Sequence, residues 1–126
     1  MANEIGDLLN EVGRILAIDK QYPLDGTFLY AEAAWQMVSV AVFKDLGDRI
    51  LYEDPTDALS DTVLELWYAE ALDKRWSTMQ YRIDGGKFEA SFTYEPLDPE
   101  VSTLDRREHI LQQHYGNKRI VYPPLP

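Results

Sequence analysis

The chain has 126 residues, with 12 Lys or Arg against 22 Asp or Glu, so its formal net charge is -10 at pH 7. That charge argues against a nucleic-acid partner, because phosphate binding relies on clustered Lys and Arg. The absence of cysteine excludes disulfides, thiol catalysis and cysteine-ligated zinc. The length and ordinary composition predict a single domain over residues 1–126.

Hydrophobicity along the chain gives no reason to expect a membrane partner. No apolar run approaches the ~20 residues that a membrane-spanning helix requires. The N-terminal residues also lack the basic and apolar regions of a secretory signal. The cytoplasm is therefore the expected compartment.

The first predicted element is an amphipathic helix over residues 3–17. Its large apolar residues recur at intervals of three and four and fall on one narrow arc: Ile5, Leu8, Leu9, Val12, Ile15 and Leu16. Such a stripe is typical of a helix that packs on a sheet. An exposed seam for a partner is the alternative.

Three strands are predicted next, over residues 27–33, 36–44 and 49–53. In the second of these, valines alternate with other fairly apolar residues, as expected of a central strand that is covered on both faces. Because the connections are short, the three strands should be antiparallel neighbours.

A second helix is predicted from Thr56 or Asp57 to about Asp73, within a segment that is strongly acidic. Between residues 45 and 73 the chain carries nine acidic residues and one basic residue, Arg49. This block is either a solvated face that aids solubility or a docking surface for a basic protein.

One face of this second helix is the candidate binding site. At 100° per residue, two apolar side chains fall among the acidic ones on the side opposite the apolar stripe. The predicted partner-binding residues are Asp57, Asp61, Glu65, Tyr68 and Leu72. Packing of the two apolar residues beneath a neighbouring loop is the alternative.

A β-hairpin is predicted over residues 76–96, with a two-residue turn at Gly85-Gly86 whose positive φ angles glycine supplies without steric cost. The register places large side chains on one face: Ile83 opposite Phe88, Tyr81 opposite Ala90, Met79 opposite Phe92 and Ser77 opposite Tyr94. Polar residues, including Arg82 and Glu89, occupy the other face. We expect the apolar face to pack on the N-terminal helix.

A third helix is predicted from Ser102 or Thr103 to Tyr115, with Leu104 and Leu111 on the same side as Tyr115. The Pro-rich tail over residues 117–126 should be extended and lie against the body through Ile120 and Tyr122. Presentation of a polyproline ligand is an alternative role for it.

Motifs for catalysis or metal binding are missing from the sequence. His109 and His114 are five residues apart on a helix, so they point away from each other and do not match paired metal ligands. Asp105 and His109 share a face, an arrangement that is more often a surface contact than half of a catalytic dyad. We therefore predict no enzyme activity, no cofactor and no metal site.

A family resemblance comes from the second half of the chain. It is carried by residues 76–94 with Asp-Gly-Gly-Lys-Phe at the turn, by Arg106-Arg107, and by the helix end His114-Tyr115-Gly116. These features resemble the YezG-like immunity proteins of bacterial toxin systems. The resemblance implies a small cytoplasmic antitoxin that binds and neutralises a cognate toxin, often a nuclease.

These elements together predict an α+β fold. Its single, mainly antiparallel sheet should have about five strands and three helices, in the order α-β-β-β-α-β-β-α. The expected partner is a protein toxin with a basic surface. The alternatives are an acidic interaction module or adaptor with no toxin partner, and a hydrolase or small-ligand binder assembled from scattered residues. Homodimerisation stays open.

Overall fold

The computed structural model describes residues 4–18, 20–34 and 37–122. Their helices and strands follow in chain order: α1 (Glu4–Leu16), β1 (Thr27–Ala34), β2 (Met37–Asp45), β3 (Ile50–Glu53), α2 (Asp57–Tyr68), the 3-10 helix η1 (Leu72–Lys74), β4 (Thr78–Asp84), β5 (Lys87–Thr93), α3 (Thr103–Tyr115) and β6 (Ile120–Val121). The predicted α+β class and element order are confirmed, and β6 is a short addition that was not predicted.

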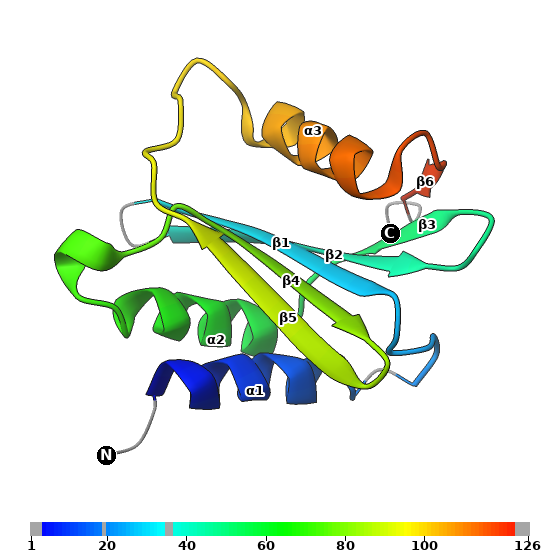
Figure 1. Ribbon diagram of the computed structural model, residues 1–126, viewed down its shortest axis with the longest axis horizontal. Helices are drawn as coiled ribbons and strands as arrows, with labels where there is room; N and C mark the ends of the chain where they lie inside the picture. Colours follow the sequence, from blue (N-terminus) through cyan, green and yellow to red (C-terminus); the bar gives the residue numbers. More distant parts are fainter. Residues whose placement is uncertain (1–3, 19, 35–36, 123–126) are drawn as a thin grey trace.

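The strands form one mixed sheet in the order β5-β4-β1-β2-β3-β6, antiparallel except for the β3–β6 pair. Helices α1 and α2 cover one face of the sheet, and α3 lies on the other (Figure 1). The two central strands are β1 and β2, and residues 27–33 of β1 are all buried. None of the described helices combines the length and apolarity needed to cross a membrane.

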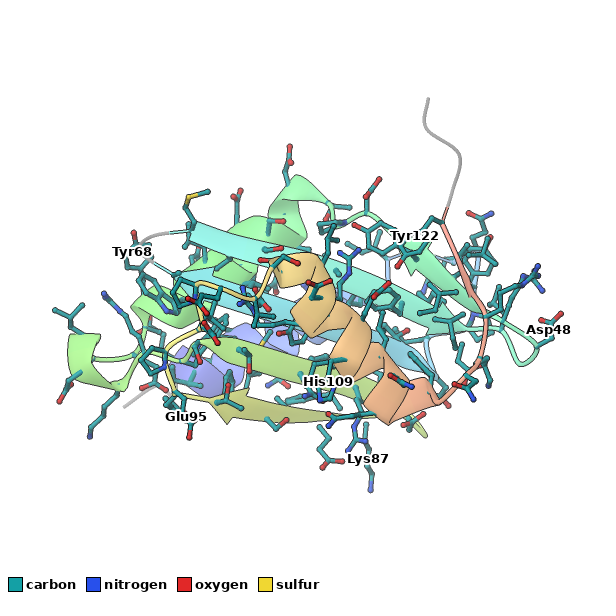
Figure 2. The ribbon with its side chains drawn as sticks, turned by 90° about the horizontal axis from the view of Figure 1, so that it is seen from above. Asp48, Tyr68, Lys87, Glu95, His109 and Tyr122 are labelled. Atoms are coloured by element: carbon teal, nitrogen blue, oxygen red, sulfur yellow. The ribbon has the colours of Figure 1, made fainter. Side chains whose placement is uncertain are left out.

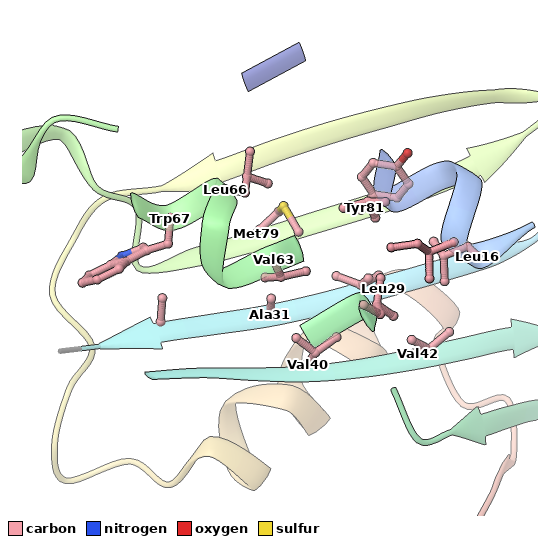
Figure 3. Close-up of a cluster of buried hydrophobic side chains, with 14 of the residues drawn as sticks. Leu16, Leu29, Ala31, Val40, Val42, Val63, Leu66, Trp67, Met79 and Tyr81 are labelled. Atoms are coloured by element: carbon pink, nitrogen blue, oxygen red, sulfur yellow. The ribbon is translucent and has the colours of Figure 1, made fainter. Parts of the chain in front are cut away.

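The larger core lies between the sheet and the pair α1 and α2 (Figure 3). Met79 and Tyr81 of β4 are fully buried there, together with Val12 of α1 and Leu29 of β1. The Tyr81 hydroxyl donates a hydrogen bond to the Leu9 carbonyl of α1 at 2.9 Å. The expected packing of the hairpin on the N-terminal helix is therefore confirmed. Burying one such large apolar side chain contributes roughly 1.5–3 kcal/mol.

A second, smaller core lies between the sheet and α3, around Phe28, Phe43 and Leu111. The contacts of α3 with this core come from its second half, which includes Tyr115. Leu104, predicted on the same side, is in the first turn of α3 and is 61% exposed. The three residues do share one side of the helix, as predicted, but at Leu104 that side is left exposed.

The hairpin forms with the predicted register from Thr78↔Thr93 to Asp84↔Lys87. Its turn glycines have φ angles of 60° and 74°, as the predicted turn requires. Tyr94 does not join the apolar face and is 57% exposed. Strand pairing ends at Thr93, so the chain leaves the sheet one residue before the predicted Ser77–Tyr94 pair.

The chain after α3 returns to the sheet, as the tail prediction required. Ile120 and Val121 pair in parallel with β3, and the Ile50 amide donates to the Arg119 carbonyl at 2.8 Å. The Tyr122 ring lies against that of Tyr52, with 5.3 Å between centroids. Residues 123–126 lie outside the described residues, so the polyproline ligand stays a prediction.

Candidate partner-binding surface

Helix α2 places its predicted acidic residues together on one exposed face. Thr56 caps the helix by accepting a hydrogen bond from the Leu59 amide at 3.2 Å. The opposite side is anchored in the larger core through buried residues: Leu59, Val63, Leu66 and Trp67. Because α2 is held in this orientation, Asp57, Asp61 and Glu65 project to solvent at successive four-residue intervals.

The three carboxylates are not neutralised locally. Within the described residues, none of Asp57, Asp61 and Glu65 forms an ion pair. Like charges four residues apart destabilise a helix by roughly 0.2–0.5 kcal/mol per pair. The acidic face therefore carries a small cost in stability that the fold does not offset with a cation on that face.

Tyr68, at the end of α2, is 43% exposed and partly covered. Its ring meets the Trp67 ring edge to face at 5.2 Å, and the Arg75 guanidinium lies 5.1 Å from its centroid. Arg75 also lies 4.7 Å from the Trp67 ring, so one cation holds both aromatics. Tyr68 thus presents one exposed surface beside a bound arginine, instead of standing free among the carboxylates.

Leu72 does not belong to the predicted helix face. Helix α2 ends at Tyr68, and Leu72 lies in η1, where its side chain is 80% exposed. Five more helical residues would carry the chain about 7.5 Å further along the helix axis. Instead the chain turns back, so that the Trp67 indole donates to the Trp76 carbonyl at 3.0 Å just before β4 begins. The predicted end of the helix at Asp73 was therefore wrong.

A buried charge network that the sequence analysis missed joins β1 to α3. Glu32 is 4% exposed and forms a two-point ion pair with Arg106, with Nε at 2.8 Å and the second guanidinium nitrogen at 3.0 Å. The Tyr30 hydroxyl donates to the same carboxylate at 2.6 Å. Arg106 also donates to the main-chain carbonyls of Asp98 and Val101.

These contacts decide the ionisation of the network. Burial alone would raise the pKa of Glu32, but hydrogen bonds from Arg106, Tyr30 and Thr103 and the charge of Arg106 together bring that pKa below its ordinary value. Burial and the hydrogen bond to Glu32 raise the pKa of Tyr30. Glu32 is therefore a buried carboxylate that keeps its charge because the arginine faces it.

The histidines do not assemble into a catalytic or metal site. His109 lies within 3.1 Å of the Gln113 side chain on the surface of α3. His114 stacks on Phe28 with 4.3 Å between centroids, and burial, with the charge of Arg82, lowers its pKa. No group of three His, Asp or Glu side chains in the part of the chain that the structure describes is placed to hold a metal ion.

Comparison with known proteins gives no assignment. No model of a protein family matches the chain, and neither does any curated protein. The likeness to the YezG-like immunity proteins therefore stays a prediction that rests on the residues quoted for it.

Proposed function

We propose that this protein is a cytoplasmic immunity protein that binds a bacterial toxin, such as a nuclease, and neutralises it by covering its basic active-site surface. The observation that supports this function best is the exposed face of α2, where Asp57, Asp61 and Glu65 lie together without an ion pair among the described residues. The resemblance to immunity proteins adds the class of partner.

Charge complementarity supplies the mechanism. A nuclease must keep a positive groove to hold phosphate, so a set of carboxylates on a rigid helix can fill that groove and exclude the substrate without any chemistry. The formal charge of -10 adds long-range attraction, although salt screens it beyond about 8 Å at physiological ionic strength. The acidic face should therefore act mainly on the rate of association.

Tyr68 supplies the second component of binding. Its ring is held by Trp67 and Arg75 at the end of the acidic face, so little side-chain freedom is lost when a partner covers it. Desolvated aromatic residues near the centre of an interface often carry much of the binding energy. Tyr68 should therefore act mainly on the rate of dissociation.

If the neighbouring gene encodes a toxin domain, the direct test is co-expression of this protein with that domain, scored as rescue of growth. Binding kinetics then locate the surface. Charge reversal in Asp61→Lys/Glu65→Lys should lower the association rate and flatten its dependence on salt, whereas Tyr68→Ala should raise the dissociation rate.

The matched control is Asp84→Lys/Glu108→Lys, which changes the net charge equally at exposed positions of β4 and α3. The control should lower the association rate less than the α2 variant. If the two double variants lowered the association rate equally, α2 would not be part of the interface. Absence of rescue by the wild-type protein, with the toxin domain shown to be active, would refute the proposed function.

A further inference from the structure

Exposed apolar side chains are concentrated at one end of the molecule. Among the described residues, nine large apolar side chains are exposed. Six of them belong to the end where β1 finishes and β2 starts: Met37, Tyr68, Leu72, Tyr94, Val101 and Leu104. We call this set the apolar end. Scattered single apolar residues are normal on a surface, whereas their concentration at one end makes that end a candidate interaction site.

The topology explains why residues so far apart in sequence lie at the same end. The Ala34–Met37 pairing closes the β1–β2 hairpin, and Thr78 pairs with Thr93 where β5 finishes. Helix α2 ends and α3 begins on this side as well. Figure 2 shows Tyr68 and Glu95 at this end of the molecule and Asp48 at the opposite one.

The surface at the apolar end is hollowed on two sides of the strap formed by residues 94–102. One hollow is lined in part by Ala34, Met37 and Leu97, and the other in part by Tyr94 and Leu97. Leu97 and Arg106 line both hollows. A partner side chain can therefore enter beside the strap and contact apolar groups of the sheet end and of the strap together.

The strap is fixed in the free protein. Arg106 donates hydrogen bonds to the carbonyl of Asp98, in the middle of the strap, and to that of Val101, near its end, while Arg106 is itself held by Glu32. The hollows are thus lined by a segment that is tied to the buried part of β1, and a ligand would not have to order it. Preorganisation of this kind improves affinity, because the entropy of ordering the loop is already lost.

The rim of the apolar end is acidic, and this selects the partner. The segments 69–78 and 94–105 contain six acidic residues and two basic ones. The acidic residues are Glu70, Asp73, Glu95, Asp98, Glu100 and Asp105, and the basic residues are Lys74 and Arg75. Arg75 is already engaged with two aromatic rings. A second copy of this chain would oppose one acidic rim to another, because a two-fold dimer brings the same patch together. A basic partner fits the rim.

We propose that the apolar end binds an extended basic segment of a partner protein and takes up one of its large apolar side chains in the hollows beside the strap. The α2 face then steers the partner, and the apolar end slows its dissociation. This inference rests on the proposed function for the identity of the partner in the cell, and the surface itself can be tested with peptides.

The probe is the peptide Lys-Arg-Leu-Trp-Arg-Lys with blocked ends, compared with the same peptide carrying serine in place of Leu and Trp. Amide chemical-shift titrations should map the first peptide to residues 94–105 and to the start of β2. The serine peptide, with the same charge, should bind roughly tenfold or more weakly, since the loss of a buried large side chain has an effect of that size.

Variants of the protein sharpen the test. Met37→Ser, which changes a side chain that lines one hollow, should weaken binding of the first peptide several-fold, whereas Ile18→Ser should leave it unchanged, and the two replaced side chains are 73% and 64% exposed in the wild type. Thermal unfolding of both variants checks that the fold is intact. Equal binding of the two peptides, equal effects of the two variants, or shifts confined to α2 would overturn the inference.

The two proposals can fail separately. Peptide binding at the apolar end, without growth rescue by the protein, would retain this surface and reject the toxin as its partner. Growth rescue that is unaffected by Met37→Ser, with no peptide shifts at residues 94–105, would retain the immunity function and reject this surface.

Discussion

Removing Arg106 should destabilise the fold more than removing any surface arginine. In Arg106→Met the Glu32 carboxylate, which is 4% exposed, would keep the Tyr30 hydroxyl but lose both guanidinium contacts. Breaking a buried pair by removing one partner costs about 3–5 kcal/mol, because a charge is left buried without compensation. Since the Arg106 side chain is itself 20% exposed, we expect the lower end, about 3 kcal/mol.

Removing the other partner, Glu32, should destabilise the fold less than removing Arg106. In Glu32→Met no buried charge remains, and Arg106 can reach water while it still donates to the carbonyls of Asp98 and Val101. We expect Glu32→Met to lower the free energy of unfolding by about 1–2 kcal/mol, because the buried Tyr30 hydroxyl loses its acceptor. The double variant Glu32→Met/Arg106→Met should be no less stable than Arg106→Met, because replacing both partners by apolar residues removes the uncompensated charge.

Urea unfolding at pH 7 measures these differences, and the expected loss for Arg106→Met corresponds to roughly 10 °C in Tm for a domain of this size. The matched control is Arg82→Met, whose ion pair with Glu89 spans 3.0 Å at the surface, with side chains 42% and 76% exposed. Arg82→Met should lower the free energy of unfolding by less than about 1 kcal/mol. An Arg106→Met protein as stable as Arg82→Met would refute the reasoning.

The pH dependence of the same variant gives a second check. In the wild type the pKa of Glu32 is below its ordinary value, so its contribution to stability is present above the unfolded pKa and is lost as the pH falls through the folded pKa. Without Arg106, burial raises the pKa of Glu32, so protonation of Glu32 removes the free-energy cost of its buried charge. The difference in free energy of unfolding between the Arg106→Met protein and the wild type should therefore become smaller as the pH falls from 7 towards 4.

Two further predictions concern α1 and α3. A Cβ at Gly13 would lie 2.7 Å from the Tyr81 hydroxyl, which donates a hydrogen bond to the Leu9 carbonyl, so Gly13→Ala should destabilise the wild type. In the Tyr81→Phe protein that hydroxyl is absent, so the higher helix propensity of alanine should make Gly13→Ala stabilising by up to about 1 kcal/mol. A urea double-mutant cycle with additive free energies would contradict that contact. Burial lowers the pKa of His114, so its stabilisation is present above the unfolded pKa of about 6.5 and is lost as the pH falls through the folded pKa. His114→Phe, which keeps an aromatic ring on Phe28, should reduce the loss of stability between pH 7 and 5, and an unchanged slope would show that His114 does not titrate with folding.

The hairpin could be predicted from sequence because the information for it is local. Alternation of apolar and polar residues fixes which face is buried, and Gly85-Gly86 fixes where the two strands meet. The same is true of the acidic face of α2, since positions four residues apart share a face in any α-helix. The C-terminal end of α2 could not be predicted in this way. It depends on the hydrogen bond between the Trp67 indole and the Trp76 carbonyl, which forms only because the chain turns back after the helix.

The Glu32–Arg106 pair shows a different limit. The two residues are 74 positions apart, and Arg106, although it is among the residues that carry the family resemblance, was not linked to Glu32 by any pattern in the sequence. One signal was nonetheless present, because Glu32 continues the row of alternate β1 residues that begins with Phe28 and Tyr30, both of which are buried. A carboxylate in such a row requires a hydrogen-bonded cation. The sequence can therefore indicate that a basic partner exists, while the fold decides which arginine it is.

The position of β1 has a consequence for synthesis of the chain. This strand is the first to be made, yet one of its two neighbours in the sheet, β4, follows it by about 50 residues. Until Asp84 has left the ribosome, the most buried strand of the protein has one unpaired edge and an apolar face that β4 and β5 do not yet extend. Such an edge is a template for pairing with other chains. Nascent chains that stop before this point should be the species most dependent on chaperones.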